Sequence, residues 1–260
     1  MFSFPFLRKK SRAGSSSENT LVRLGRVLNK LEPGSISGEL RGLDCATMLE
    51  GFEAMPPPER RLGAGLHPLI FPLKSARKIA VLRQGFSLSA NAREFAANDS
   101  AGIHAWEPDA LVAPLNTALL LADHKLTGRF PLPSLETALI VTTRIDDAPL
   151  APHHRDLLWR AFEVPVFEQL LSWDGSVIAR ECELHCGLHL ADDNVIATLR
   201  DDQLLLTHLN HVEEPIVLAR TGYSALMSKD PCDCGATTAR LGCLTPVRTR
   251  VRAASAGSAD

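Results

Sequence analysis

The chain has 260 residues, of which 45% are hydrophobic and 22% charged, a balance typical of a globular protein with a sizeable core. Its formal net charge of −2 gives no general attraction to nucleic acid or to an anionic membrane. No apolar run reaches the ~18 residues that a membrane-spanning helix needs. The composition therefore excludes both as expected partners.

The cellular compartment is indicated by the first residues and by the cysteines. The chain begins MFSFPFLRKK, with apolar residues before basic ones, which is the reverse of a secretory signal. Six cysteines in a chain of this length, four of them close to histidines, do not resemble a secreted disulfide framework. We expect a cytoplasmic protein with reduced thiols or a bound metal.

The first part of the chain predicts an α/β arrangement. A serine-rich, weakly apolar stretch at residues 1–18 predicts a disordered tail. Leucines at helical spacing then predict a helix between Thr20 and Pro33-Gly34. Later segments alternate between buried strands, expected at 78–82 and 137–142, and helices, expected at 89–97, 110–125 and from Pro152 to Phe162. Such alternation predicts a sheet with some parallel pairing, flanked by helices.

Beyond Ser172 the pattern changes to short apolar runs separated by polar, turn-like residues. These runs are residues 177–180, 195–197, 204–206 and 216–218. They predict a β-rich, antiparallel second lobe. We therefore divide the chain into an N-terminal tail (1–18), an α/β part (19–171), a β-rich lobe (172–245) and a C-terminal tail (246–260).

Two clusters of cysteine and histidine carry the clearest local chemistry. The first is Cys182-Glu-Leu-His185-Cys186-Gly-Leu-His189, and the second is Cys232-Asp-Cys234-Gly235. Zinc is usually held tetrahedrally by two short ligand pairs that the fold brings together. Cys232 and Cys234 would supply one pair, and Cys182 with His185 or His189 the other. Four protein ligands would make a closed, structural site. Alternatively, the cysteines are small core hydrophobes and the histidines are exposed.

A series of short motifs extends the pattern from Phe162 to Arg240. In order they are VPVFEQ, SWDG, IAREC, GLH, LLLTHLN, PI, RTG and CDCG. This order resembles the phenylacetate-CoA ligase branch of the adenylate-forming superfamily, over about residues 135–241. The resemblance implies a partial adenylate-forming-enzyme core: a mixed sheet flanked by helices, with a β-rich C-terminal lobe. It also implies a structural zinc bound by Cys182, a histidine (His189, or His185 as the alternative), Cys232 and Cys234.

Departures from the family pattern concern the parts that handle ATP. Trp173-Asp174 stands where the family has Thr-Glu, so a phosphate-binding hydroxyl is lost, although Asp174 could still bind magnesium. Tyr223 stands at the position of the ribose-binding aspartate. No Ser/Thr/Gly-rich phosphate loop precedes Ser172, and the chain ends near the family's hinge, before the lobe that carries its catalytic lysine. These groups act as a unit, so we expect little ATP and magnesium binding and little residual adenylation.

The sequence thus favours a non-catalytic or degenerate, zinc-stabilised relative of adenylate-forming enzymes. It would bind a small aryl or acyl ligand, or a partner protein, in a cleft lined by Trp173, Asp174 and Arg220, with Phe167 behind them. Simple packing of Trp173 and a surface ion pair of Arg220 are equally compatible with the sequence. The alternative function is a divergent or split acyl- or aryl-CoA ligase that takes its missing parts from another chain. The histidines at 153, 154, 208 and 211 are expected to be exposed loop residues.

Overall fold

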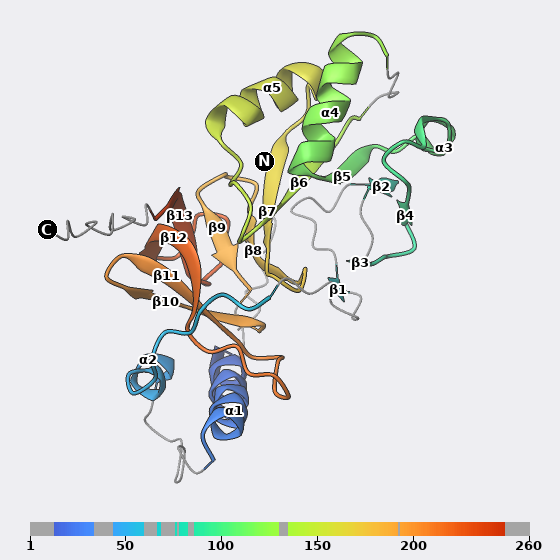
Figure 1. The fold of residues 1–260 in the computed structure, drawn as a ribbon. Helices are drawn as coiled ribbons and strands as arrows, with labels where there is room; N and C mark the ends of the chain where they lie inside the picture. The colour runs from blue at the N-terminus through green and yellow to red at the C-terminus, as the bar shows by residue number, and fades with distance from the viewer. Residues whose placement is uncertain are drawn as a thin grey trace, which may run out of the picture.

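The computed structural model describes residues 13–33, 44–59, 67–68, 76, 78–82, 86–129, 135–191 and 193–247. Within these ranges, one sheet has eleven strands in the order β10-β11-β12-β13-β9-β8-β7-β6-β5-β2-β4. This architecture confirms the predicted α/β class with a mixed sheet (Figure 1). A separate parallel pair joins β1 (His67–Pro68) to β3 (Phe86–Ser87).

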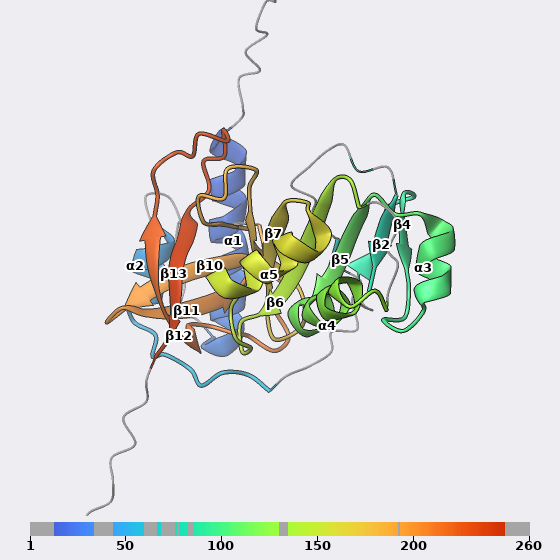
Figure 2. The same ribbon diagram turned by 90° about the horizontal axis from the view of Figure 1, so that it is seen from above.

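The parallel half of the sheet contains five strands. They are β2 (Ile79–Val81), β4 (Ala92–Glu94), β5 (Ala110–Pro114), β6 (Ala138–Arg144) and β7 (Val166–Leu171). Helices α4 (Leu115–Leu126) and α5 (Pro152–Phe162) lie together over one face, as Figures 1 and 2 both show. Leu121 and Leu158 of these helices share a buried cluster with Leu111 and Leu139 of the strands. The short helix α3 (Ser100–Trp106) lies at the outer end of this half.

The other half of the sheet is antiparallel, beginning with the pairing of β7 to β8. Its strands are β8 (Val177–Glu181), β9 (Leu188–Leu190), β10 (Val195–Arg200), β11 (Gln203–His208), β12 (Ala219–Ser228) and β13 (Arg240–Pro246). Helix α1 (Ala13–Leu31) buries Leu24 and Leu28 against Leu205 and Val217 on one face. Helix α2 (Cys45–Leu49) is held there by Arg200, which donates to the carbonyls of Leu49 and Phe52 (2.7 Å each).

Three segments differ from the sequence-based expectation. The helix expected over 110–125 is strand β5 followed by helix α4, because the first apolar residues are buried in the sheet and the helix begins only after Pro114. The helix expected over 89–97 is edge strand β4, which pairs with β2. Residues 216–218 precede β12 and are not part of a strand, since Leu218 has a left-handed backbone (φ 49°).

The other expected elements are present, and the ends of the chain are described only in part. Helix α1 begins at Ala13, before Thr20, and ends at Leu31 as predicted. The rest of the predicted N-terminal tail, residues 1–12, and most of the C-terminal one, residues 248–260, lie outside the described residues.

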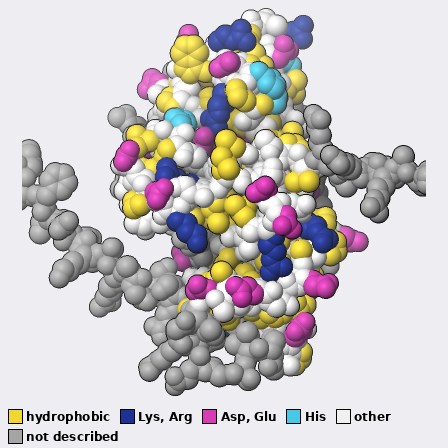
Figure 3. Space-filling view, turned by 90° about the vertical axis from the view of Figure 1, so that its left-hand side faces the viewer, with side chains coloured by type: hydrophobic (Ala, Val, Ile, Leu, Met, Phe, Trp, Pro, Cys, Tyr) yellow, Lys and Arg dark blue, Asp and Glu magenta, His cyan; other side chains and the backbone are white. Residues whose placement is uncertain are grey.

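Acidic and basic side chains alternate over the face drawn in Figure 3, in keeping with a net charge close to zero. Among the helices that the structure describes, none has the length and apolar character needed to cross a membrane.

Candidate metal centre

The two cysteine and histidine clusters meet because β9 pairs with β13. Cys182 directly follows β8, and His189 lies in β9 opposite Arg240 of β13. Cys232 and Cys234 lie in the connection between β12 and β13. The structure thereby brings one ligand atom from each of Cys182, His189, Cys232 and Cys234 within 4.8 Å of one another.

Distances within this set suit ligands that converge on one point. The Cys182 and Cys232 sulfurs are 3.9 Å apart, and the Cys234 sulfur is 3.6 Å from Nε2 of His189. Nδ1 of His189 lies 3.3 Å from the Thr238 hydroxyl, so the ring is oriented with Nε2 toward the sulfurs. His189 and Cys232 are buried, whereas Cys234 is exposed.

Glycines shape the backbone around the cluster. Gly235 has φ 87°, so the chain can turn directly after Cys234. Gly187 has φ 113°, and a Cβ there would stand 2.8 Å from the carbonyl oxygen of Leu241. Both positions favour glycine for conformational and, at Gly187, steric reasons.

His185, the alternative ligand, points away from this cluster. Its ring stacks on Phe167 with 4.7 Å between centroids, and its Nδ1 lies 3.6 Å from a carboxylate oxygen of Glu181. The structure therefore groups His189, and not His185, with the three cysteines.

Sequence reasoning left out Cys186, which lies beside the same sulfurs. Its Sγ is 2.8 Å from that of Cys232 and 3.3 Å from that of Cys182. The hydrogen bond to Cys232 raises the pKa of the exposed Cys186 to about 11 and lowers the pKa of Cys232 to about 7. Burial raises the pKa of Cys182, but hydrogen bonds from Cys186 outweigh it and leave that pKa below its ordinary value. The spacing of four residues from Cys182 was the available sequence signal.

The donor set of three sulfurs and one imidazole nitrogen fits a tetrahedral zinc site. Four protein ligands fill the coordination sphere, so such a site would stabilise the fold and leave no position for substrate.

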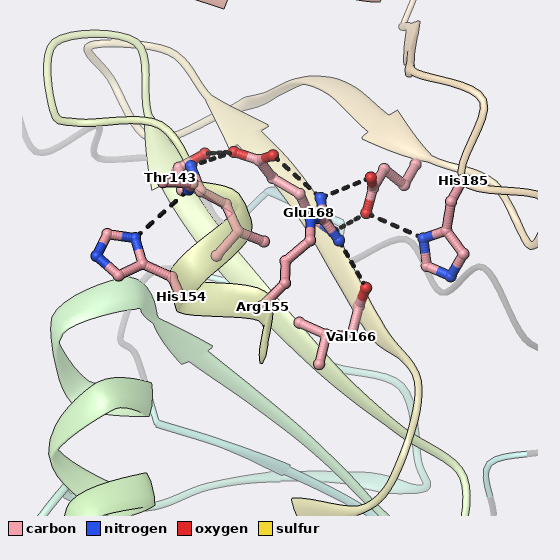
Figure 4. A network of polar contacts seen from close by, with 9 residues as sticks. Thr143, His154, Arg155, Val166, Glu168 and His185 are labelled. Atoms are coloured by element: carbon pink, nitrogen blue, oxygen red, sulfur yellow. Dashed lines mark hydrogen bonds and ion pairs between the residues drawn. The ribbon is translucent and has the colours of Figure 1, made fainter. Parts of the chain in front are cut away.

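A network of carboxylates and Arg155 holds the end of β8 that leads into Cys182 (Figure 4). Arg155 of α5 donates to Glu181 (2.6 Å) and lies 3.6 Å from Glu168 of β7. Glu181 also accepts from the backbone N–H of Glu168 (2.7 Å), and Glu168 accepts from the Thr143 hydroxyl (2.7 Å). Burial raises the pKa of Glu168. The network fixes β8 against β7 and α5.

The residues predicted to line a ligand cleft are placed in two different surroundings. Trp173 is only 3% exposed and packs in a core with Ala219, Tyr223 and Ala225. Arg220 is exposed and pairs with Leu205, which belongs to the core beneath α1. Because neighbouring strand residues alternate between faces, Arg220 faces away from the side of the sheet where Trp173 packs. The structure does not bring Arg220 to Trp173.

Asp174 follows Trp173 in a turn at the end of β7. Its Oδ1 accepts from the Ser176 N–H (3.0 Å) and hydroxyl (2.8 Å), and its Oδ2 is 2.8 Å from Nε2 of His211. Burial raises the pKa of this carboxyl, but the hydrogen bonds from His211 and Ser176 outweigh it and hold the pKa well below its usual range.

Two of the histidines expected to be exposed are instead joined to this turn. His208, at the end of β11, is buried, and its Nε2 lies 2.8 Å from the buried Ser172 hydroxyl. The ring of His211 meets that of His208 edge-on at 5.2 Å. The expectation was wrong for His208, which is a buried strand residue, because its neighbours come from the turn after β7, far away in sequence. His211 lies in a loop as expected but is only partly exposed.

Comparison with known proteins supports the fold. No protein-family model matches the sequence, and no curated protein does. Among solved structures, the open conformation of 2-hydroxyisobutyryl-CoA ligase, bound to 2-HIB-AMP and CoA, superposes with a TM-score of 0.52 at 16% identity. The match covers 68% of this chain and 44% of the ligase. The same ligase in its thioesterification state gives 0.52 at 17% identity, covering 69% and 43% of the two chains. Anthranilate CoA ligase AuaEII, bound to anthranoyl-AMP, superposes more loosely, with a TM-score of 0.43 at 11% identity over 65% and 40% of the chains.

The likeness to 2-hydroxyisobutyryl-CoA ligase is one of fold alone, since the identity is only 16% to 17%. The fold of this chain corresponds to part of the 2-hydroxyisobutyryl-CoA ligase fold, and the chain spans less than half the length of that ligase.

Proposed function

We propose that this protein is a zinc-stabilised, non-catalytic binding protein built on an adenylate-forming-enzyme core of the phenylacetate-CoA ligase branch. The observation that carries the proposal is the convergence of Cys182, His189, Cys232 and Cys234 within 4.8 Å. A metal ion bound by four protein side chains stabilises the fold. A protein stabilised in this way can bind a small molecule without catalysing a reaction of it.

The surroundings of the turn after β7 support the absence of adenylation. Where the resemblance places a phosphate-binding hydroxyl, Trp173 is buried in the core. Where it places the ribose-binding carboxylate, the hydroxyl of Tyr223 donates to the carbonyl of Asp147. Neither side chain can replace a group that holds ATP.

The proposed ligand is a small aryl or acyl compound, with a partner protein as the second candidate. The neighbouring 2-hydroxyisobutyryl-CoA ligase binds an acyl adenylate and CoA, which favours an acyl group. Asp174 and the core around Trp173 would face such a ligand, which would be bound in the cytoplasm.

The competing function is a divergent or split acyl- or aryl-CoA ligase. The chain matches only 44% of the neighbouring ligase, and this function requires the remaining parts of such an enzyme as well. Asp174 retains a carboxylate that could hold magnesium in such an assembly.

A calorimetric titration of ATP with magnesium, on protein of known metal content, separates the two functions. We expect no ATP binding by the wild-type chain, while aryl or acyl carboxylates in a panel raise the melting temperature. Asp174→Asn is the matched control, since it removes the candidate magnesium ligand at nearly constant shape. Micromolar ATP binding that Asp174→Asn abolishes, or CoA thioester formation by the chain alone, would put the ligase first.

A further inference from the structure

A second group of metal-binding side chains lies at the turn between β7 and β8, on elements that the cysteine cluster does not use. One ligand atom from each of Asp174, His208 and His211 lies within 4.8 Å of the others. Asp174 comes from the turn, His208 from the end of β11, and His211 from the loop that follows. Two parts of the chain that lie far apart in sequence thus meet at one point.

Hydrogen bonds orient two members of this group from outside. Ser176 donates to Oδ1 of Asp174 from both its N–H and its hydroxyl, while Oδ2 faces His211. The Ser172 hydroxyl lies 2.8 Å from Nε2 of the buried His208. In metal sites, hydrogen-bond partners of this kind fix the tautomer of a histidine ligand and the direction in which each ligating atom points.

An Asp174–His211 ion pair alone would account for only part of this arrangement. The pair is joined by a second imidazole, that of His208, whose ring meets His211 edge-on at 5.2 Å. Two imidazoles packed together at a carboxylate are the arrangement of a metal-binding triad. Ligand atoms around one ion lie roughly 3.4 Å apart when the bonds are about 2.1 Å long. Small side-chain rotations would bring the three atoms to such positions.

We propose that Asp174, His208 and His211 form a second metal site that binds a divalent first-row transition-metal ion such as Zn²⁺, Co²⁺ or Mn²⁺. Two nitrogens and one carboxylate suit these ions, whereas magnesium and calcium prefer oxygen ligands throughout. Three protein ligands leave at least one position for water or for an oxygen of a bound ligand. The side chain of His211 is 30% exposed, so the group is reached from solvent on that side.

The two sites differ in donors, and cobalt distinguishes them. Co²⁺ bound by thiolates gives a sulfur-to-metal charge-transfer band, which an ion bound by nitrogen and oxygen lacks. Full-length chain without an affinity tag, stripped of metal and titrated with Co²⁺, is expected to bind two ions. Only one of them should produce the charge-transfer band.

Variants assign the second ion. His211→Ala and Asp174→Asn should each weaken its binding at least about tenfold and leave the charge-transfer band unchanged. Cys232→Ser should remove that band and leave the second ion bound. His153→Ala, which removes an exposed histidine on α5, is the matched control and should bind two ions. Far-ultraviolet circular dichroism checks that each variant is folded.

Two outcomes would overturn the proposal. One is a wild-type chain that binds a single ion, through thiolates, with His211→Ala unchanged. The other is a second ion that both His211→Ala and Asp174→Asn retain with wild-type affinity. Because the charge-transfer band is followed separately, failure of this site and failure of the structural zinc site are distinguishable.

Discussion

Glu168 shows how a single buried carboxylate contributes to the fold around the candidate metal centre. It is 6% exposed and accepts from Thr143 and, at 3.3 Å, from the N–H of Leu150, with Arg155 3.6 Å away. Burial raises its pKa, so the folded protein holds the proton over a pH range where the unfolded chain has released it. The stability that this carboxyl contributes is therefore fully present below its ordinary pKa near 4.5, and is lost as the pH rises through the raised value.

Replacing Glu168 by glutamine should remove this pH dependence. Relative to wild type, the free energy of unfolding of Glu168→Gln should rise from pH 4.5 toward neutral pH, by on the order of 1 kcal/mol. Urea denaturation at a series of pH values measures the difference, and Glu94→Gln on the exposed edge strand is the control. A constant difference across this range would show that the pKa of Glu168 is the same in the folded and the unfolded protein.

The role of a side chain could be predicted from the sequence only where the residues that it contacts lie nearby in the chain or where it belongs to a known motif. The three cysteines of the candidate metal centre could be named in this way, with His189 and His185 as alternatives for the fourth ligand. The grouping of His208 with Asp174 could not be predicted from the sequence, because it depends on β11 lying near the turn after β7. The preference for His189 over His185 likewise depends on the backbone turn at His185, which has φ 51°.

Among the elements, the connection between β12 and β13 depends most on the proposed zinc. Cys232 and Cys234 tie this connection to β8 and β9, where the other two ligands lie. The sheet itself joins β9 to β13 by only two residue pairs, His189 with Arg240 and Leu188 with Leu241. A metal ion that joins these segments would therefore stabilise a pair of strands, β9 and β13, that the sheet itself joins only briefly.

Removing one thiolate should destabilise the metal-loaded protein. Cys232→Ser is expected to lose the ion and at least about 2.7 kcal/mol of stability, the contribution of a ligand present at a hundred times its dissociation constant. Thermal unfolding with and without a chelator measures this. The chelator should lower the melting temperature of wild type by more than that of Cys232→Ser, which keeps only the second candidate site.

Cys243→Ser provides the matched control for that experiment. Cys243 is an exposed thiol in β13 and lies outside the candidate ligand set, so its replacement should keep both the ion and its stabilisation. Equal destabilisation by both substitutions, or a wild type insensitive to chelator, would contradict a structural metal.

Element types followed from the sequence where periodicity was distinct, as in α5 and the strands of the β-rich lobe. They did not follow at residues 110–125, where an apolar run buried on both faces of the sheet has the same composition as a buried helix. They also failed at β4, where pairing with β2 outweighs local preference. These two errors concern segments whose structure is set by distant neighbours, whereas the third, at residues 216–218, reflects the left-handed backbone of Leu218.

At the scale of the whole molecule, one sheet connects a parallel half covered by α4 and α5 with an antiparallel half covered by α1. The predicted boundary at Ser172 falls where parallel pairing gives way to antiparallel pairing, between β7 and β8. Both candidate metal sites lie in the antiparallel half or at this change of pairing. The metal-binding chemistry is thus concentrated where the resemblance to adenylate-forming enzymes is carried by motifs.

X-ray absorption at the zinc edge would identify the atoms bound to zinc in this protein. The zinc-loaded chain would carry His211→Ala, so that the second site does not contribute. We expect three sulfur scatterers at about 2.3 Å and one nitrogen at about 2.0 Å, from Cys182, Cys232, Cys234 and His189. Four sulfurs would mean that Cys186 replaces His189, and a spectrum with only nitrogen and oxygen neighbours would contradict the proposed zinc site.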